Sequence, residues 1–155
     1  MPLVLLALLA PAHAKDLRSR VGVGFEQQFA TPMSALSLRY GFPTGKPTAN
    51  VALEADVGAD LSSVTDPKVF AGGRLLYGVV AEDNMNLYLS AGAGYAVDGK
   101  AGVVRVQPGA GAEFFFFGLE NLGFSAEFGV NVDLGAAWAV KTVGAAPSVG
   151  VHYYF

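Results

Sequence analysis

Residues 124–134 have the sequence FSAEFGVNVDL, which alternates between apolar side chains and polar side chains or glycine. Successive residues of a β-strand point to opposite faces, so a period of two predicts a strand with one apolar and one polar face. Phe124, Phe128 and Leu134 fall on the apolar face, and Glu127 and Asp133 fall on the other. The stretch is therefore predicted to be a strand whose two faces meet different surroundings.

The same alternation recurs in seven further segments, 21–26, 36–42, 51–58, 69–79, 87–96, 104–116 and 149–155. One face of the eight segments carries no charged residue. The other face carries all their charges, at Glu26, Arg39, Glu54, Asp56, Arg74, Arg105, Glu113, Glu127 and Asp133. Hydrophobic residues make up 52% of the 155 residues and charged residues 15%, against about 25% charged in an average soluble domain. The pattern predicts an all-β domain of eight antiparallel strands.

Glycine indicates which face turns inward. A soluble barrel would bury the apolar face, whereas a membrane barrel turns that face to lipid and keeps the polar face inside. The charged face is rich in glycine, for example at Gly22, Gly24, Gly92 and Gly94, which is unusual for a strand surface in water. In a closed eight-stranded barrel the lumen is only wide enough for side chains, and glycine there relieves crowding. We therefore predict an up-and-down transmembrane β-barrel.

The N-terminus has the features of an export signal. Leu3 to Ala10 are apolar, Pro11 interrupts them, and Ala12-His13-Ala14 resembles a cleavage site before Lys15. We expect residues 1–14 to be a signal peptide and residues 15–155 to form the barrel domain.

The connections predict which end of the barrel faces the periplasm. Short turns are expected there at Pro43–Ala49, Ala81–Met85 and Gly118–Gly123, and the longest outer loop at Gly135–Pro147. Aromatic residues gather at the strand ends beside the short turns, as expected of a membrane interface. Within segment 104–116, Pro108 removes a backbone donor and predicts a bulge or local bend.

The final strand carries a resemblance to a known family. Val149, Val151, Tyr153 and the terminal Phe155 resemble the C-terminal assembly signal of outer-membrane proteins. The whole of residues 15–155 is similar to the small eight-stranded barrels of the OmpA/OmpX type. This resemblance implies a bacterial outer-membrane location, handling by the barrel-assembly machinery, and contact with outer-membrane lipid and lipopolysaccharide. We expect a monomer.

The lumen is predicted to contain one layer of ionic contacts. Counting from the short turns places six residues at similar heights: Arg39, Glu54, Arg74, Glu113, Glu127 and His152. Charged groups in a narrow interior must be paired. Glu113 and Glu127 face each other across one hairpin, so an arginine, a shared proton or His152 should separate them. The layer either fills and stiffens the lumen or acts as a gate for ions and small solutes.

Several functions are not expected. The net charge is −3 and there is no basic cluster, which argues against nucleic-acid binding. Cysteine is absent, and the glycine runs match no phosphate-binding motif, so we predict no cofactor. One histidine among scattered carboxylates does not predict a metal site. Ser90, Ser125 and Ser148 show no partnership with His152, so an enzyme is not predicted.

The predicted function is a structural or interaction role in the cell envelope, with a lumen plugged by ionic pairs. The alternative is a narrow channel or carrier for small solutes. A lipid-modifying outer-membrane enzyme is the weakest alternative.

Overall fold

The computed structural model describes residues 15–27, 34–45, 50–63, 65, 67–98, 101–134, 139–142 and 148–155. Nine β-strands lie within these residues: β1 (Val21–Gln27), β2 (Ser34–Gly41), β3 (Val51–Asp60), β4 (Lys68–Ala81), β5 (Met85–Asp98), β6 (Ala101–Phe115), β7 (Leu122–Leu134), β8 (Ala139–Thr142) and β9 (Ser148–Tyr154). In this part of the chain there is no helix long and apolar enough to cross a membrane. The expected signal peptide lies outside the described residues.

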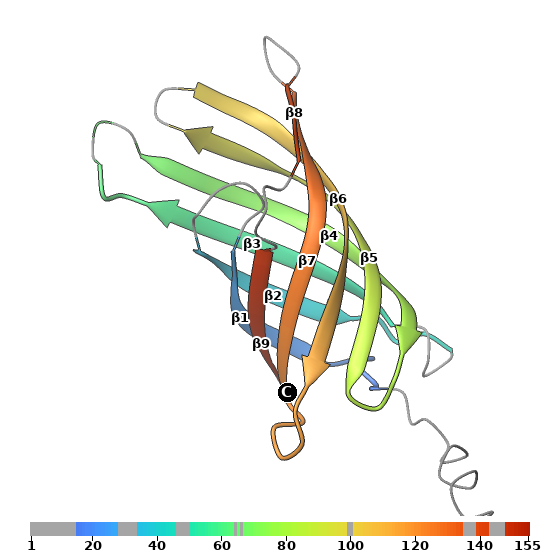
Figure 1. The fold of residues 1–155 in the computed structure, drawn as a ribbon. Coiled ribbons are helices and arrows are strands. Elements are labelled where there is room, and N and C mark those ends of the chain that lie inside the picture. The colour runs from blue at the N-terminus through green and yellow to red at the C-terminus, as the bar shows by residue number, and fades with distance from the viewer. Residues whose placement is uncertain are drawn as a thin grey trace, which may run out of the picture.

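Eight of these strands form a closed ring. Strands β1 to β7 pair antiparallel in chain order, β9 pairs with β7, and β9 also pairs with β1 (Figure 1). Each of the eight strands therefore has a hydrogen-bonded neighbour on both sides, as a sheet needs when it stands in lipid. The predicted all-β fold of eight antiparallel strands closed into a barrel is confirmed.

Strand β8 corrects one prediction. The sequence predicts a loop over Gly135–Pro147, but Ala139–Thr142 pair with Val130–Asp133 of β7. Strand β9 pairs only with the first half of β7, from Leu122 to Glu127. The far half of β7 needs another partner on that side, and β8 supplies it at the upper end of the barrel in Figure 1. The segment is too short for its alternation to be recognised in the sequence.

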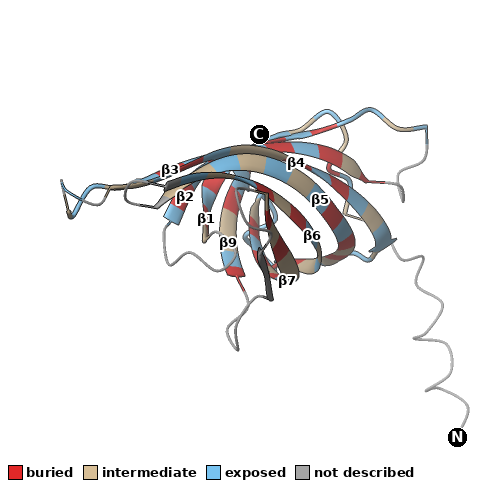
Figure 2. Ribbon diagram, turned by 90° about the horizontal axis from the view of Figure 1, so that it is seen from above, coloured by how far each residue is buried: buried red, intermediate tan, exposed pale blue. Residues whose placement is uncertain are grey.

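The two faces are oriented as predicted. Buried and exposed residues alternate along the strands (Figure 2). Phe25 is 60% exposed on the outside of β1, whereas Glu26 beside it is 2% exposed inside the lumen. The apolar outer surface also includes edge-to-face aromatic pairs, such as Tyr153 and Phe155 with ring centroids 5.1 Å apart. The charged and glycine-rich face lines the interior.

The bulge predicted at Pro108 is absent from the described pairing. Pro108 stands opposite Ala91 with no break in register, and the β7 pairs before and after it keep the same register. The proline lies on the exposed face and lacks an N–H. The matching register on either side of it shows that the strand has no extra residue there. The register shifts instead between Gly78 and Val80 in β4.

Closure between β1 and β9 depends on Gly24. A Cβ atom at this position would lie 1.9 Å from the carbonyl oxygen of Val151 and 2.8 Å from the Cα atom of His152. Both obstacles are backbone atoms of the neighbouring strand, which can move only if the two strands separate. Gly24 therefore permits the close approach by which the ring is completed.

We predict that Gly24→Ala lowers the free energy of unfolding by about 1–3 kcal/mol, the usual cost of overpacking. Urea unfolding of the protein refolded in bilayers, followed by circular dichroism, measures the change. Gly45→Ala is the matched control, because a Cβ atom there meets no described atom within 4 Å. Equal stability of the two variants would contradict the role of Gly24 in closure.

Candidate functional site

The lumen site is built on a ladder of three adjacent strands. Arg39 on β2, Glu54 on β3 and Arg74 on β4 are register partners, so all three side chains enter the lumen side by side. Each is nearly inaccessible to solvent. Arg39 Nε donates to Glu54 Oε2 at 2.6 Å, and Arg74 Nε donates to Glu54 Oε1 at 2.8 Å. Glu54 is therefore held by a guanidinium on each side.

The two arginines then reach across the lumen. Arg39 Nη1 donates to Glu113 Oε1 on β6 at 3.0 Å. Arg74 Nη1 donates to Glu127 Oε2 on β7 at 2.8 Å, and its Nη2 contacts Glu26 on β1. Strand β6 is not paired with β2, and neither β7 nor β1 is paired with β4. The guanidinium groups consequently connect opposite walls of the barrel.

Two tyrosines complete the contacts of the distant carboxylates. Tyr154 donates its hydroxyl to Glu113 Oε1 at 2.8 Å, and Tyr88 donates to Glu127 Oε1 at 2.7 Å. Each glutamate therefore has one arginine and one tyrosine of its own. The two glutamates are not register partners across the hairpin, and each pairs with a different arginine, Glu113 with Arg39 and Glu127 with Arg74. His152 contacts other partners.

The structure brings five of the six predicted residues into direct contact, namely Arg39, Glu54, Arg74, Glu113 and Glu127. It adds Glu26 and Asp56, which height counting had left out; Asp56 Oδ2 lies 3.6 Å from Arg74 Nε. The strands are tilted, so residues of equal height are not equally distant from the turns. Allowing for strand tilt would have added both carboxylates.

His152 lies at the edge of the network and bonds a serine that the sequence analysis missed. Its Nε2 lies 2.9 Å from Ser37 Oγ and 3.8 Å from Glu54 Oε2. Both residues pair with Gly24, from β2 and from β9, which explains why they meet. A serine–histidine–acid relay needs the acid on Nδ1 and the serine on Nε2. Here both neighbours lie at Nε2, so the geometry is not that of a relay.

The same region contains atoms spaced as metal ligands. Ligand atoms of Glu26, Glu54 and His152 lie within 4.8 Å of one another. Both oxygens of Glu54, however, already accept from guanidinium groups. A cation at this point would have to compete with two fixed positive charges, so the carboxylates are arranged for arginine.

A second group of polar pairs lies nearer the end of the barrel at which β8 pairs with β7. Arg105 and Asp133 form a bidentate pair, with Nε–Oδ1 of 2.6 Å and Nη2–Oδ2 of 2.9 Å. Gln107 Nε2 donates to Asn131 Oδ1 at 3.2 Å. All four residues are buried and belong to the β6–β7 hairpin. The described lumen is thus occupied over much of its length.

The mouth of the barrel beside the β4–β5 and β6–β7 turns is covered by the segment before β1. Leu17 is buried against Phe115 and Tyr154. Its backbone N–H donates to Asn50 Oδ1 at 3.3 Å, and Asn50 Nδ2 donates to the Lys15 carbonyl at 2.9 Å. The role of this segment could not be predicted from the sequence, because a short stretch outside the strands has no hydrophobic periodicity.

Comparison with solved structures identifies outer-membrane barrels of the same fold. The N-terminal β-barrel domain of Pseudomonas aeruginosa OprF aligns with 89% of this chain and 98% of its own, at 19% identity and a TM-score of 0.62. The chain has the fold of small outer-membrane β-barrels. The Yersinia pestis outer-membrane protein Ail, solved in a phospholipid bilayer nanodisc, aligns with 88% of this chain and 97% of its own, at 12% identity and a TM-score of 0.57. Comparisons with protein-family models and with curated proteins gave no match.

We predict that Arg74→Met lowers the free energy of unfolding of this barrel by about 3–5 kcal/mol, because it leaves buried carboxylates without a counter-charge. Urea unfolding measures the loss. Arg18→Met is the control, since Arg18 pairs with Asp16 at the surface and exposed pairs add little stability. A loss no larger than that of the control would show that the Arg74 contacts do not stabilise the fold.

Proposed function

We propose that the protein is an integral bacterial outer-membrane barrel with a structural or interaction role in the envelope, and that its lumen is closed. The observation that carries the proposal is the pair of guanidinium groups, Arg39 and Arg74, which span the lumen between opposite walls. Buried charges held on several sides rarely move, because moving them breaks several strong hydrogen bonds at once.

The periplasmic mouth supports the same proposal. Leu17 covers the ionic network on the side of this mouth. The cavity that remains between Leu17 and Arg39 has a volume of only about 30 Å³. That is space for about one water molecule. A solute would therefore have to displace both the N-terminal segment and the ion pairs to cross the barrel.

Export by a signal peptide over residues 1–14 is part of the proposal, as are assembly through the C-terminal signal Val149, Val151, Tyr153 and Phe155 and a monomeric state. The apolar belt would face lipid, and the outer end would face lipopolysaccharide. The lipid-modifying enzyme of the sequence analysis receives no support from the geometry of His152 and Ser37 described above.

A narrow channel is the second candidate, and the charge of the lumen favours one form of it. The described network contains more carboxylates than guanidinium groups, from Glu26, Glu54, Asp56, Glu113 and Glu127. If the ion pairs exchanged partners and the lumen opened, its wall would carry negative charge. Such a path would pass cations in preference to anions.

Single-channel recording in planar bilayers distinguishes these candidates. We expect no steady conductance from the wild type, and a cation-selective conductance from Arg39→Ala or Arg74→Ala, which removes both bulk and positive charge. Each substitution is also combined with Leu17→Ala, because the Leu17 side chain at the mouth could otherwise block the current through an opened network. Steady conductance of the wild type would refute the closed lumen. Silence of the double variants would refute the two arginines as its closure and would leave that role to the Arg105–Asp133 and Gln107–Asn131 pairs.

A further inference from the structure

The β6–β7 turn carries an unusually exposed apolar tip. Phe117 is 93% exposed, and Phe116 and Leu119 on either side of it are also exposed. The ring of Phe116 packs against Phe124 on the lipid-facing surface, with centroids 5.3 Å apart. The tip is therefore continuous with the membrane-facing belt. An apolar group at this position is unfavourable in water and suits the interface of a bilayer.

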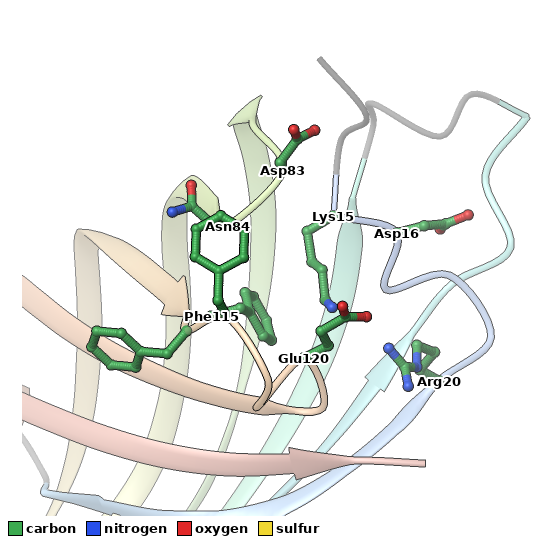
Figure 3. A pocket seen from close by; sticks show the side chains of 9 residues that line it. Lys15, Asp16, Arg20, Asp83, Asn84, Phe115 and Glu120 are labelled. Atoms are coloured by element: carbon green, nitrogen blue, oxygen red, sulfur yellow. The ribbon is translucent and has the colours of Figure 1, made fainter. Parts of the chain in front are cut away.

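A pocket of about 400 Å³ lies beside this tip at the periplasmic end (Figure 3). It is formed where the N-terminal segment, the β4–β5 turn and the β6–β7 turn meet. Phe115, Phe116 and Phe117 supply its aromatic wall, and Lys15 and Arg20 supply two positive charges. The pocket thus combines an apolar side next to lipid with a charged side next to water.

Lys15 and Arg20 share the pocket with Glu120, whose negative charge acts on the Lys15 ammonium without forming a direct ion pair. The Lys15 ammonium lies 4.8 Å from the centre of the Phe115 ring and makes no direct ion pair with a described carboxylate. Burial and the nearby Arg20 guanidinium lower the pKa of Lys15, against a smaller opposing effect of Glu120. Arg20 is held in place by Asn121 Oδ1 at 2.6 Å. A phosphate that contacts both Lys15 and Arg20 would relieve the repulsion that Glu120 only partly offsets.

The pocket also offers negative charge. Asp16 is engaged by Arg18 at 2.7 Å, and that hydrogen bond lowers the pKa of Asp16. Asp83 and Glu120 make no hydrogen bond or direct ion pair among the described residues. In the view of Figure 3, Asp83 and Arg20 lie on opposite sides of Lys15. A ligand that suits the whole pocket therefore needs a negative and a positive group together, and an apolar part.

We propose that this pocket binds a phospholipid of the periplasmic leaflet whose zwitterionic headgroup joins a phosphate to a primary ammonium. The phosphate lies between Lys15 and Arg20, the ammonium group donates to Asp83, and an acyl chain follows Phe116 and Phe117. A purely anionic headgroup suits the site less well, because Asp16, Asp83 and Glu120 repel it. The proposal rests on the membrane placement given under the proposed function.

Thermal unfolding in detergent micelles tests the proposal, with phosphatidylethanolamine, phosphatidylcholine or phosphatidylglycerol of identical acyl chains added in turn. A ligand that binds the folded state raises the unfolding midpoint. We expect the largest rise with phosphatidylethanolamine. Lys15→Gln and Asp83→Asn should each weaken that lipid's affinity about tenfold, the usual effect of removing one charge-assisted contact.

Asp60→Asn is the matched control, since Asp60 ends β3 at the opposite end of the barrel. Its response to phosphatidylethanolamine should equal that of the wild type. Equal responses to all three lipids, or a stronger response to phosphatidylglycerol, would overturn the proposal. The proposal would also be overturned if Lys15→Gln and Asp83→Asn both responded to phosphatidylethanolamine as the wild type does.

Two further measurements separate the possible failures. If soluble glycerophosphoethanolamine alone raises the midpoint as much as the lipid, the acyl contact with Phe116 and Phe117 is wrong. Insertion into vesicles is scored by resistance to SDS before boiling. A chain that does not insert refutes the membrane placement, whereas one that inserts without discriminating among lipids refutes only the headgroup site.

Discussion

Closure of an eight-stranded sheet is the constraint on which the rest of this structure depends. A ring of eight strands encloses a lumen only as wide as its own side chains. Every polar group that points inward must therefore find its partner across a few ångströms, because bulk water has little access. Glu54 illustrates the result, since it is fully buried and lies between Arg39 and Arg74. The ion pairs are a consequence of closure.

The glycines of the inner face follow from the same constraint. A Cβ atom at Gly92 would lie 2.3 Å from Arg74 Cγ, and one at Gly22 would lie 2.8 Å from the Tyr154 ring. The long side chain of one strand thus lies over the glycine of the next. The high glycine content of the inner face is explained by this arrangement, in which each large side chain occupies the space above a glycine of the neighbouring strand. Substituting such a glycine would displace an arginine or tyrosine of the network.

The sequence predicted the features that repeat and missed those that occur once. Strand positions, inward and outward faces, and the ladder of Arg39, Glu54 and Arg74 follow from a period of two and antiparallel pairing. The contact of Ser37 with His152 required the pairing of both β2 and β9 with β1, which no local pattern contains. Leu17 belongs to a segment without periodicity, so its burial arises only from the completed fold.

The two groups of ion pairs differ in when they can form. Arg105 and Asp133 are register partners within one hairpin, so this pair needs only β6 and β7. Arg39 and Glu113 are 74 residues apart and lie on strands that are not paired with each other. Their contact exists only after the ring has closed. An unpaired charge inside a nearly closed barrel is costly, whereas the paired charge is stable. The central network therefore penalises a partly open ring and favours the complete one, which makes closure of the last seam, between β1 and β9, cooperative with formation of the ion pairs.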